Sequence, residues 1–107
     1  MIRFTFIVLF IAACTGSSPS GIAASEVVCP PDSTLTYESF GSVFLADNCL
    51  SCHTSKDRPA LTSKAAVQAN KGAIIDVAVV STTMPANSGL AVEERQLLGE
   101  WLACGAP

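Results

Sequence analysis

The sequence predicts a small all-α domain. Three segments carry apolar residues at helical spacing, the stretches between them lack clear hairpin signals, and no internal repeat is apparent. A chain of 107 residues has room for one domain at most. We expect this domain over residues 29–107, after an amino-terminal stretch of different composition.

The first residues have the layout of a secretory signal. One basic residue, Arg3, precedes an apolar run over residues 4–13. This run is too short for a membrane-spanning helix, which needs about 20 apolar residues. The segment "IAAC" ending at Cys14 resembles the lipobox of bacterial lipoproteins, in which cleavage before the cysteine leaves it to carry acyl chains. A signal peptide over residues 1–13 is therefore expected.

Lipidated Cys14 would be followed by a flexible tether, since residues 15–28 are rich in Ser, Gly and Ala. The expected location is the periplasmic side of a bacterial membrane, held by a lipid anchor. Cleavage after Ala24 is the alternative, and it would give a soluble periplasmic or secreted protein. Loss of Arg3 leaves five basic and nine acidic side chains, a net charge of about −4, which disfavours nucleic acid and favours partners with a basic face.

The first helix is expected from Thr36 to Cys49, with Thr34 or Thr36 as its cap. Its apolar residues recur at helical spacing: Tyr37, Phe40, Val43 and Phe44. A second helix is expected after Thr62 or Ser63, although the segment "AIIDVAVV" is β-branched enough for a buried strand. Its stripe consists of Val67, Ile74 and Ala78.

The third helix is expected within "AVEERQLLGEWLACG". Acidic residues occupy its first turn, and Gly105 followed by Pro107 ends it. The aligned apolar residues are Leu97, Leu98, Trp101 and Leu102.

The segment "CLSCH" contains Cys49, Cys52 and His53, the only histidine of the chain. With five Cys and one His, a C-x-x-C-H sequence is expected by chance only about 0.002 times. This spacing is the attachment pattern of c-type haem: each thiol can add to one vinyl group, and the histidine next to the second cysteine supplies an imidazole to the iron. A thioredoxin-type dithiol, which needs a βαβ context, and a zinc site, which needs a fourth ligand, are the alternatives.

The second axial ligand of such an iron is expected to be Met84. It is the only methionine outside the signal segment, and it precedes Pro85 in the loop-like stretch "TTMPANSG". A methionine in a polar loop is badly placed to fill a core. A lysine, or an open coordination position, is the alternative.

On these residues the chain resembles the class I, mitochondrial-type c-type cytochromes from about Thr36 to Ala103. The resemblance implies a cytochrome c-like domain of three or more helices around one covalent haem. It also implies that the first and last helices cross at a glycine about eight residues before the first haem cysteine. Gly41 has this position, with Leu98 and Trp101 as its partners.

The family also implies a proline carbonyl that accepts the hydrogen bond of the haem-ligating imidazole. Pro59, six residues after His53, is the only nearby proline. Crossed terminal helices would bring together the two cysteines left over, so an exported protein is expected to pair Cys29 with Cys104. Several side chains are expected to pack against the ring: Phe40, Phe44, Val67, Ile74, Leu97 and Trp101.

The function expected from these features is one-electron transfer between redox proteins, without enzymatic activity. If both His53 and Met84 bind iron, no coordination position remains for a substrate. A haem-based sensor or ligand binder with a displaceable Met84, and a structural lipoprotein whose cysteines serve only folding, are the alternatives.

Overall fold

The computed structural model describes residues 21–55, 58–86 and 89–107. Within these ranges the chain is helical and has no strands, which confirms the predicted all-α class. The predicted signal peptide, Cys14 and most of the tether lie outside the described residues. No helix of the described part is long and apolar enough to cross a bilayer.

The first predicted helix consists of a π-helical turn, η2 (Tyr37–Gly41), that continues into α1 (Ser42–Asn48). Thr36 begins it with a capping box: its hydroxyl accepts from the Ser39 amide, and the Ser39 hydroxyl accepts from the Thr36 amide, both at 3.0 Å. Val43 is 59% exposed, so the predicted apolar stripe is wrong at this position. The cause is that Phe44, the next residue, already turns toward the core.

The second predicted helix is also present, but it is divided into α2 (Lys64–Ala69), α3 (Lys71–Ile74) and η3 (Ile75–Val80). Ser63 caps α2 by accepting from the Ala66 amide at 3.1 Å. Asn70 separates α2 from α3, and its side chain donates to the carbonyl of Ala66 at 2.7 Å. This local bond competes with regular helical pairing, which explains the break.

The third predicted helix is α4 (Val92–Ala103). It ends in a Schellman motif: Gly105, at φ 96°, donates to Leu102, and Ala106 donates to Trp101. Leu98, Trp101 and Leu102 are buried, whereas Leu97 is 42% exposed. The prediction that Leu97 belongs to the buried stripe is therefore wrong, because a rotation of about 100° from Leu98 carries it to the outer side of the helix.

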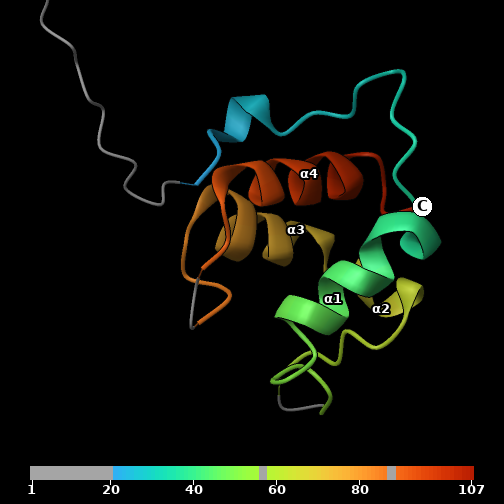
Figure 1. The fold of residues 1–107 in the computed structure, drawn as a ribbon, viewed down its shortest axis with the longest axis vertical. Helices are drawn as coiled ribbons and strands as arrows, with labels where there is room; N and C mark the ends of the chain where they lie inside the picture. The colour runs from blue at the N-terminus through green and yellow to red at the C-terminus, as the bar shows by residue number, and fades with distance from the viewer. Residues whose placement is uncertain (1–20, 56–57, 87–88) are drawn as a thin grey trace, which may run out of the picture.

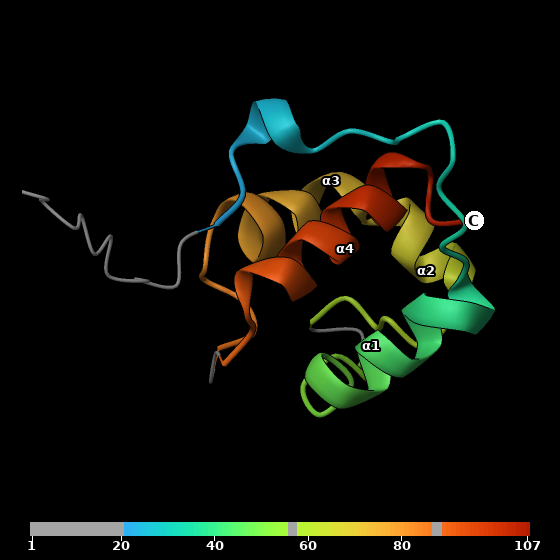
Figure 2. The same ribbon diagram turned by 45° about the horizontal axis from the view of Figure 1, so that its top comes forward.

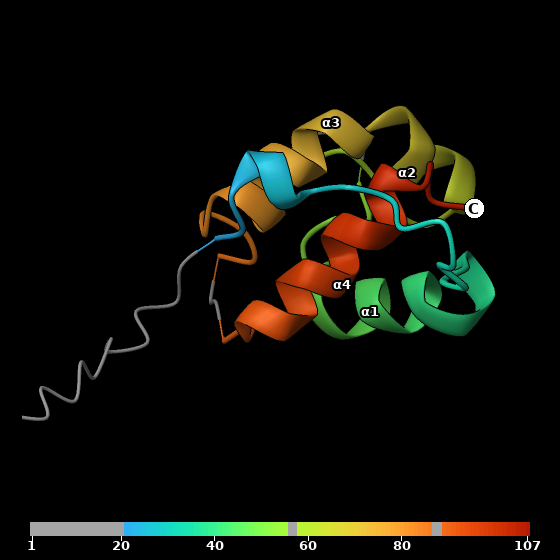
Figure 3. The ribbon, with the colours of Figure 1, turned by 90° about the horizontal axis from the view of Figure 1, so that it is seen from above.

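Helix α4 is central to the arrangement. It packs against η3 (Figure 1), and the turned view places α1 on the opposite side of α4 from α3 (Figure 2). Viewed from above, α1 and α4 cross (Figure 3). At the crossing a Cβ atom on Gly41 would overlap the ring of Trp101, so the close approach requires glycine, as the family resemblance implies.

The segment before η2 passes over α3 and α4 on the side away from α1 (Figure 2). Ile22 is buried, and its amide donates to the carbonyl of Val79 at 2.8 Å. A Cβ atom on Gly21 would overlap the carbonyl of Val80, and Val27 lies beside Gly99. Residues before Cys29, the predicted start of the folded unit, therefore also pack against the domain.

Candidate functional site

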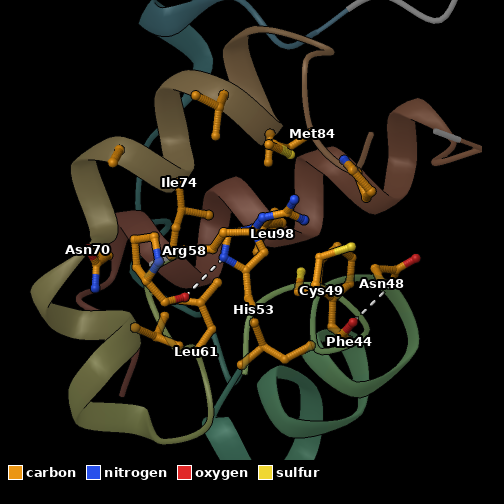
Figure 4. Close-up of a pocket in the computed structure, with 18 of the residues that line it drawn as sticks. Phe44, Asn48, Cys49, His53, Arg58, Leu61, Asn70, Ile74, Met84 and Leu98 are labelled. Atoms are coloured by element: carbon orange, nitrogen blue, oxygen red, sulfur yellow. Dashed lines mark hydrogen bonds between the residues drawn. The ribbon is translucent and has the colours of Figure 1, made fainter. Parts of the chain in front are cut away.

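A cavity of about 620 Å³ lies between α1, the α2–η3 segment, the loop around Met84 and α4. This volume is in the range of small-molecule and cofactor sites, about 300–1,000 Å³. Cys49, Cys52, His53 and Met84 all line it, so the structure brings together the four predicted haem-binding residues. Figure 4 shows that His53 and Met84 approach the cavity from different sides, Met84 from above and His53 from below in that view.

His53 is positioned by the turn that follows α1. Its amide donates to the carbonyl of Cys49 at 3.0 Å, and its carbonyl accepts from Leu61 at 2.9 Å. The ring nitrogen Nδ1 lies 3.0 Å from the carbonyl oxygen of Pro59. Because a carbonyl can only accept, Nδ1 is the donor in this pair, and in a neutral imidazole this leaves Nε2 as the nitrogen available to a ligand. Pro59 thus has the place that the resemblance implies.

The two cysteines of "CLSCH" differ in exposure. Cys52 is exposed, whereas Cys49 is half-buried, and burial raises the pKa of the Cys49 thiol from 9.0 to about 11. Redox-active dithiols need the opposite shift, since the thiolate is the reactive species. This chemistry, and the helical surroundings, disfavour the thioredoxin-type alternative. The zinc alternative also lacks support, because no group of three or more Cys, His, Asp or Glu in the described ranges could hold a metal ion.

We expect the cofactor-free chain to show this difference in alkylation. At pH 8 iodoacetamide should modify Cys52 well before Cys49, because the Cys49 thiol is neutral below its pKa of about 11. The Cys49 rate should rise with pH until about 11. Peptide mass mapping of a time course measures both rates, and equal rates at pH 8 would contradict the described burial of Cys49.

Both main-chain groups of Met84 are hydrogen-bonded. Its amide donates to the carbonyl of Val77 at 2.8 Å, and its carbonyl accepts from Arg95 at 2.8 Å. Its side chain packs against the hydrophobic core and lines the cavity beside Pro85. The loop position that the sequence predicts for Met84 therefore coincides with the wall of the cavity.

The rest of the lining is mostly apolar. Of the side chains predicted to surround the ring, Phe44, Val67, Ile74 and Trp101 line the cavity. Phe40 and Leu97 do not, so the prediction is wrong for both. Phe40 instead packs edge-on against Trp101, with ring centroids 5.9 Å apart, and Leu97 faces outward.

Several lining residues were not predicted from sequence, among them Arg58, Leu61, Asn70 and Leu90. Leu61 and Leu90 are isolated apolar residues in non-helical segments, where no periodicity marks them as buried. The sequence could have indicated a helix break at Asn70, since an Asn inside a helical pattern often marks such a break.

Cys29 and Cys104 are at disulfide distance, with Cα atoms 4.8 Å apart, as the assignment of the remaining cysteines predicts. Neither lines the cavity. A bond across 75 positions would stabilise the fold by about 4 kcal/mol on the chain-entropy model. The bond ties the amino-terminal segment to the end of α4.

Comparisons with protein-family models, with curated proteins and with solved structures find no match to this chain. Two thiols, one imidazole nitrogen and one thioether surround a single apolar cavity, and this donor set fits a covalently attached haem.

Proposed function

We propose that this chain is a monohaem c-type cytochrome of class I that carries single electrons between redox proteins. The observation that supports this best is the convergence of Cys49, Cys52, His53 and Met84 on one cavity. These residues come from two segments about thirty positions apart, and nothing in ordinary core packing requires the "CLSCH" sequence to face the only methionine of the described chain.

Each residue has a defined role in this proposal. The Sγ atoms of Cys49 and Cys52 would hold one haem c through thioether bonds. His53 would ligate the iron through Nε2, because Nδ1 is held by the Pro59 carbonyl. Met84 would supply the thioether sulfur as the second axial ligand.

When bound, the haem supplies a reversible one-electron couple. The apolar lining excludes water, and a thioether ligand favours ferrous iron, which raises the potential relative to two imidazoles. If His53 and Met84 filled both axial positions, no iron site would be left for a substrate, so we propose an electron carrier and not an enzyme. Its partners would be redox proteins with a basic face, met through small interfaces.

We further propose export to the periplasmic side of a bacterial membrane and anchoring through Cys14. The proposal of export and anchoring rests on the basic residue, the apolar run and the "IAAC" segment at the amino terminus. Pairing of Cys29 with Cys104 suits an oxidising compartment.

The test is the absorption spectrum of the protein produced with a haem-attachment system. The reduced protein is expected to give six-coordinate, low-spin bands that carbon monoxide does not change, because Met84 would occupy the sixth position. A large shift with carbon monoxide would identify a ligand binder instead. A purified protein without haem bands would leave only a structural role.

Replacing Cys49 or Cys52 by alanine is expected to weaken covalent haem retention, and the double replacement to abolish it. Haem staining of a denaturing gel measures this. The matched control is Cys29→Ala with Cys104→Ala, which also removes two cysteines but none from the cavity, and it should keep the stain. Equal staining of the Cys49→Ala/Cys52→Ala protein and the wild type would refute the attachment site.

A further inference from the structure

Arg95, in the second turn of α4, is fully buried and is the one charged side chain in the core of the described residues. A guanidinium carries a fixed positive charge, and burying a charge is costly unless hydrogen bonds compensate for it. Such a residue needs an explanation beyond helix formation.

Its hydrogen bonds include one to Met84. The Nη1 atom of Arg95 donates to the carbonyl of Ala78 at 2.6 Å and to the carbonyl of Met84 at 2.8 Å. Ala78 belongs to η3, which also supplies the Val77 carbonyl that accepts from the Met84 amide at 2.8 Å. Both main-chain groups of Met84 are thus fixed, one by η3 and the other by α4 through Arg95.

We infer that Arg95 is a positioning residue that holds Met84 at the wall of the cavity. This inference rests on the proposed function, in which Met84 is an iron ligand. A thioether ligand that stands in a loop must be held in place if it is to remain bound to iron when other ligands compete for the position. Arg95 reaches this loop from α4 and so couples the position of Met84 to the most buried helix of the domain.

The geometry favours arginine over lysine. One Nη atom carries two hydrogens in a fixed plane and can serve two carbonyls at once, whereas a lysine ammonium is a flexible point donor. An Arg95→Lys protein should therefore keep part of the anchoring, and an Arg95→Gln protein should lose it.

Two measurements on the same proteins test the inference. The first is amide hydrogen exchange at Met84, which needs no haem and reports local opening of the loop. The second is the affinity of the haem-loaded ferric protein for added imidazole, which competes with the Met84 sulfur. Gln68→Leu is the matched control, because Gln68 also donates a side-chain hydrogen bond to a distant carbonyl, that of Ala106 at 3.0 Å, but does not line the cavity.

For Arg95→Gln we expect Met84 exchange and imidazole affinity both to rise about tenfold or more, given the usual loss when hydrogen bonds to a charged group are removed. The Arg95→Lys protein should show exchange and imidazole affinity between those of Arg95→Gln and the wild type. If Arg95→Gln does not fold, Arg95→Lys alone tests whether Arg95 anchors Met84. Gln68→Leu should change neither quantity by more than about twofold.

Unchanged exchange in the Arg95 variants would overturn the anchoring role. Faster exchange with unchanged imidazole affinity would also overturn the inference, because the anchor would then not serve the ligand. If the wild type binds no haem, the proposed function fails, and Met84 exchange alone still decides whether Arg95 anchors the loop.

Discussion

A Met84→Ala protein is expected to lose the weak sulfur-to-iron absorption band at the red end of the ferric spectrum and to become harder to reduce. Met84 is the methionine at the cavity wall, and His53 is the only histidine of the chain, so no ordinary strong ligand replaces the thioether. Water or a lysine would stabilise ferric iron. The midpoint potential should fall on the order of 0.1 V or more, since axial ligands set haem potentials over about 0.8 V.

Leu90→Ala is the matched control for this experiment. Leu90 is buried and lines the same cavity, but it has no atom that can bind iron. This variant should lose stability and keep the sulfur band. A Met84→Ala protein whose ferric spectrum and potential equal those of the wild type would show that Met84 only fills space.

Replacing Trp101 by alanine is expected to lower the free energy of unfolding by about 3–5 kcal/mol, the usual cost of removing a large aromatic side chain from a core. Trp101 is fully buried, fills the crossing at Gly41 and lines the cavity. Its ring also lies 6.4 Å from that of Tyr37, centroid to centroid. Denaturant unfolding followed by circular dichroism measures the loss.

Leu97→Ala provides the control on the same helix. Because Leu97 is 42% exposed, its truncation should change the unfolding free energy by no more than about 0.5 kcal/mol. Similar losses for Trp101→Ala and Leu97→Ala would contradict the described orientation of α4.

Much of the framework could be predicted from sequence because it depends on local chemistry. Helical periodicity located the three helical segments, and Thr36 and Ser63 were among the expected caps. Gly41 could be found as well, since its spacing from Cys49 is a feature of the family that the chain resembles. The donor set of the cavity follows from the types of residue in "CLSCH" and from the scarcity of methionine.

The features that could not be predicted depend on tertiary packing, which the pattern of a single sequence does not show. Arg95 stands in the segment "EERQ", where a charged residue reads as solvent-facing, yet it is fully buried. Ile22 lies in a stretch of Ser, Gly and Ala that resembles a tether, yet it is buried, and its amide donates to the carbonyl of Val79. Leu97 has the right residue type for the core but the wrong rotation about α4.

The most direct test of the haem assignment is the mass of the intact, denatured wild-type protein after production with a haem-attachment system. Covalent attachment through Cys49 and Cys52 predicts a mass equal to the processed chain plus one haem, and a tryptic peptide containing "CLSCH" that carries the whole addition. A mass equal to the polypeptide alone, with the Cys49 and Cys52 thiols free to be alkylated, would contradict the proposal that this protein is a c-type cytochrome.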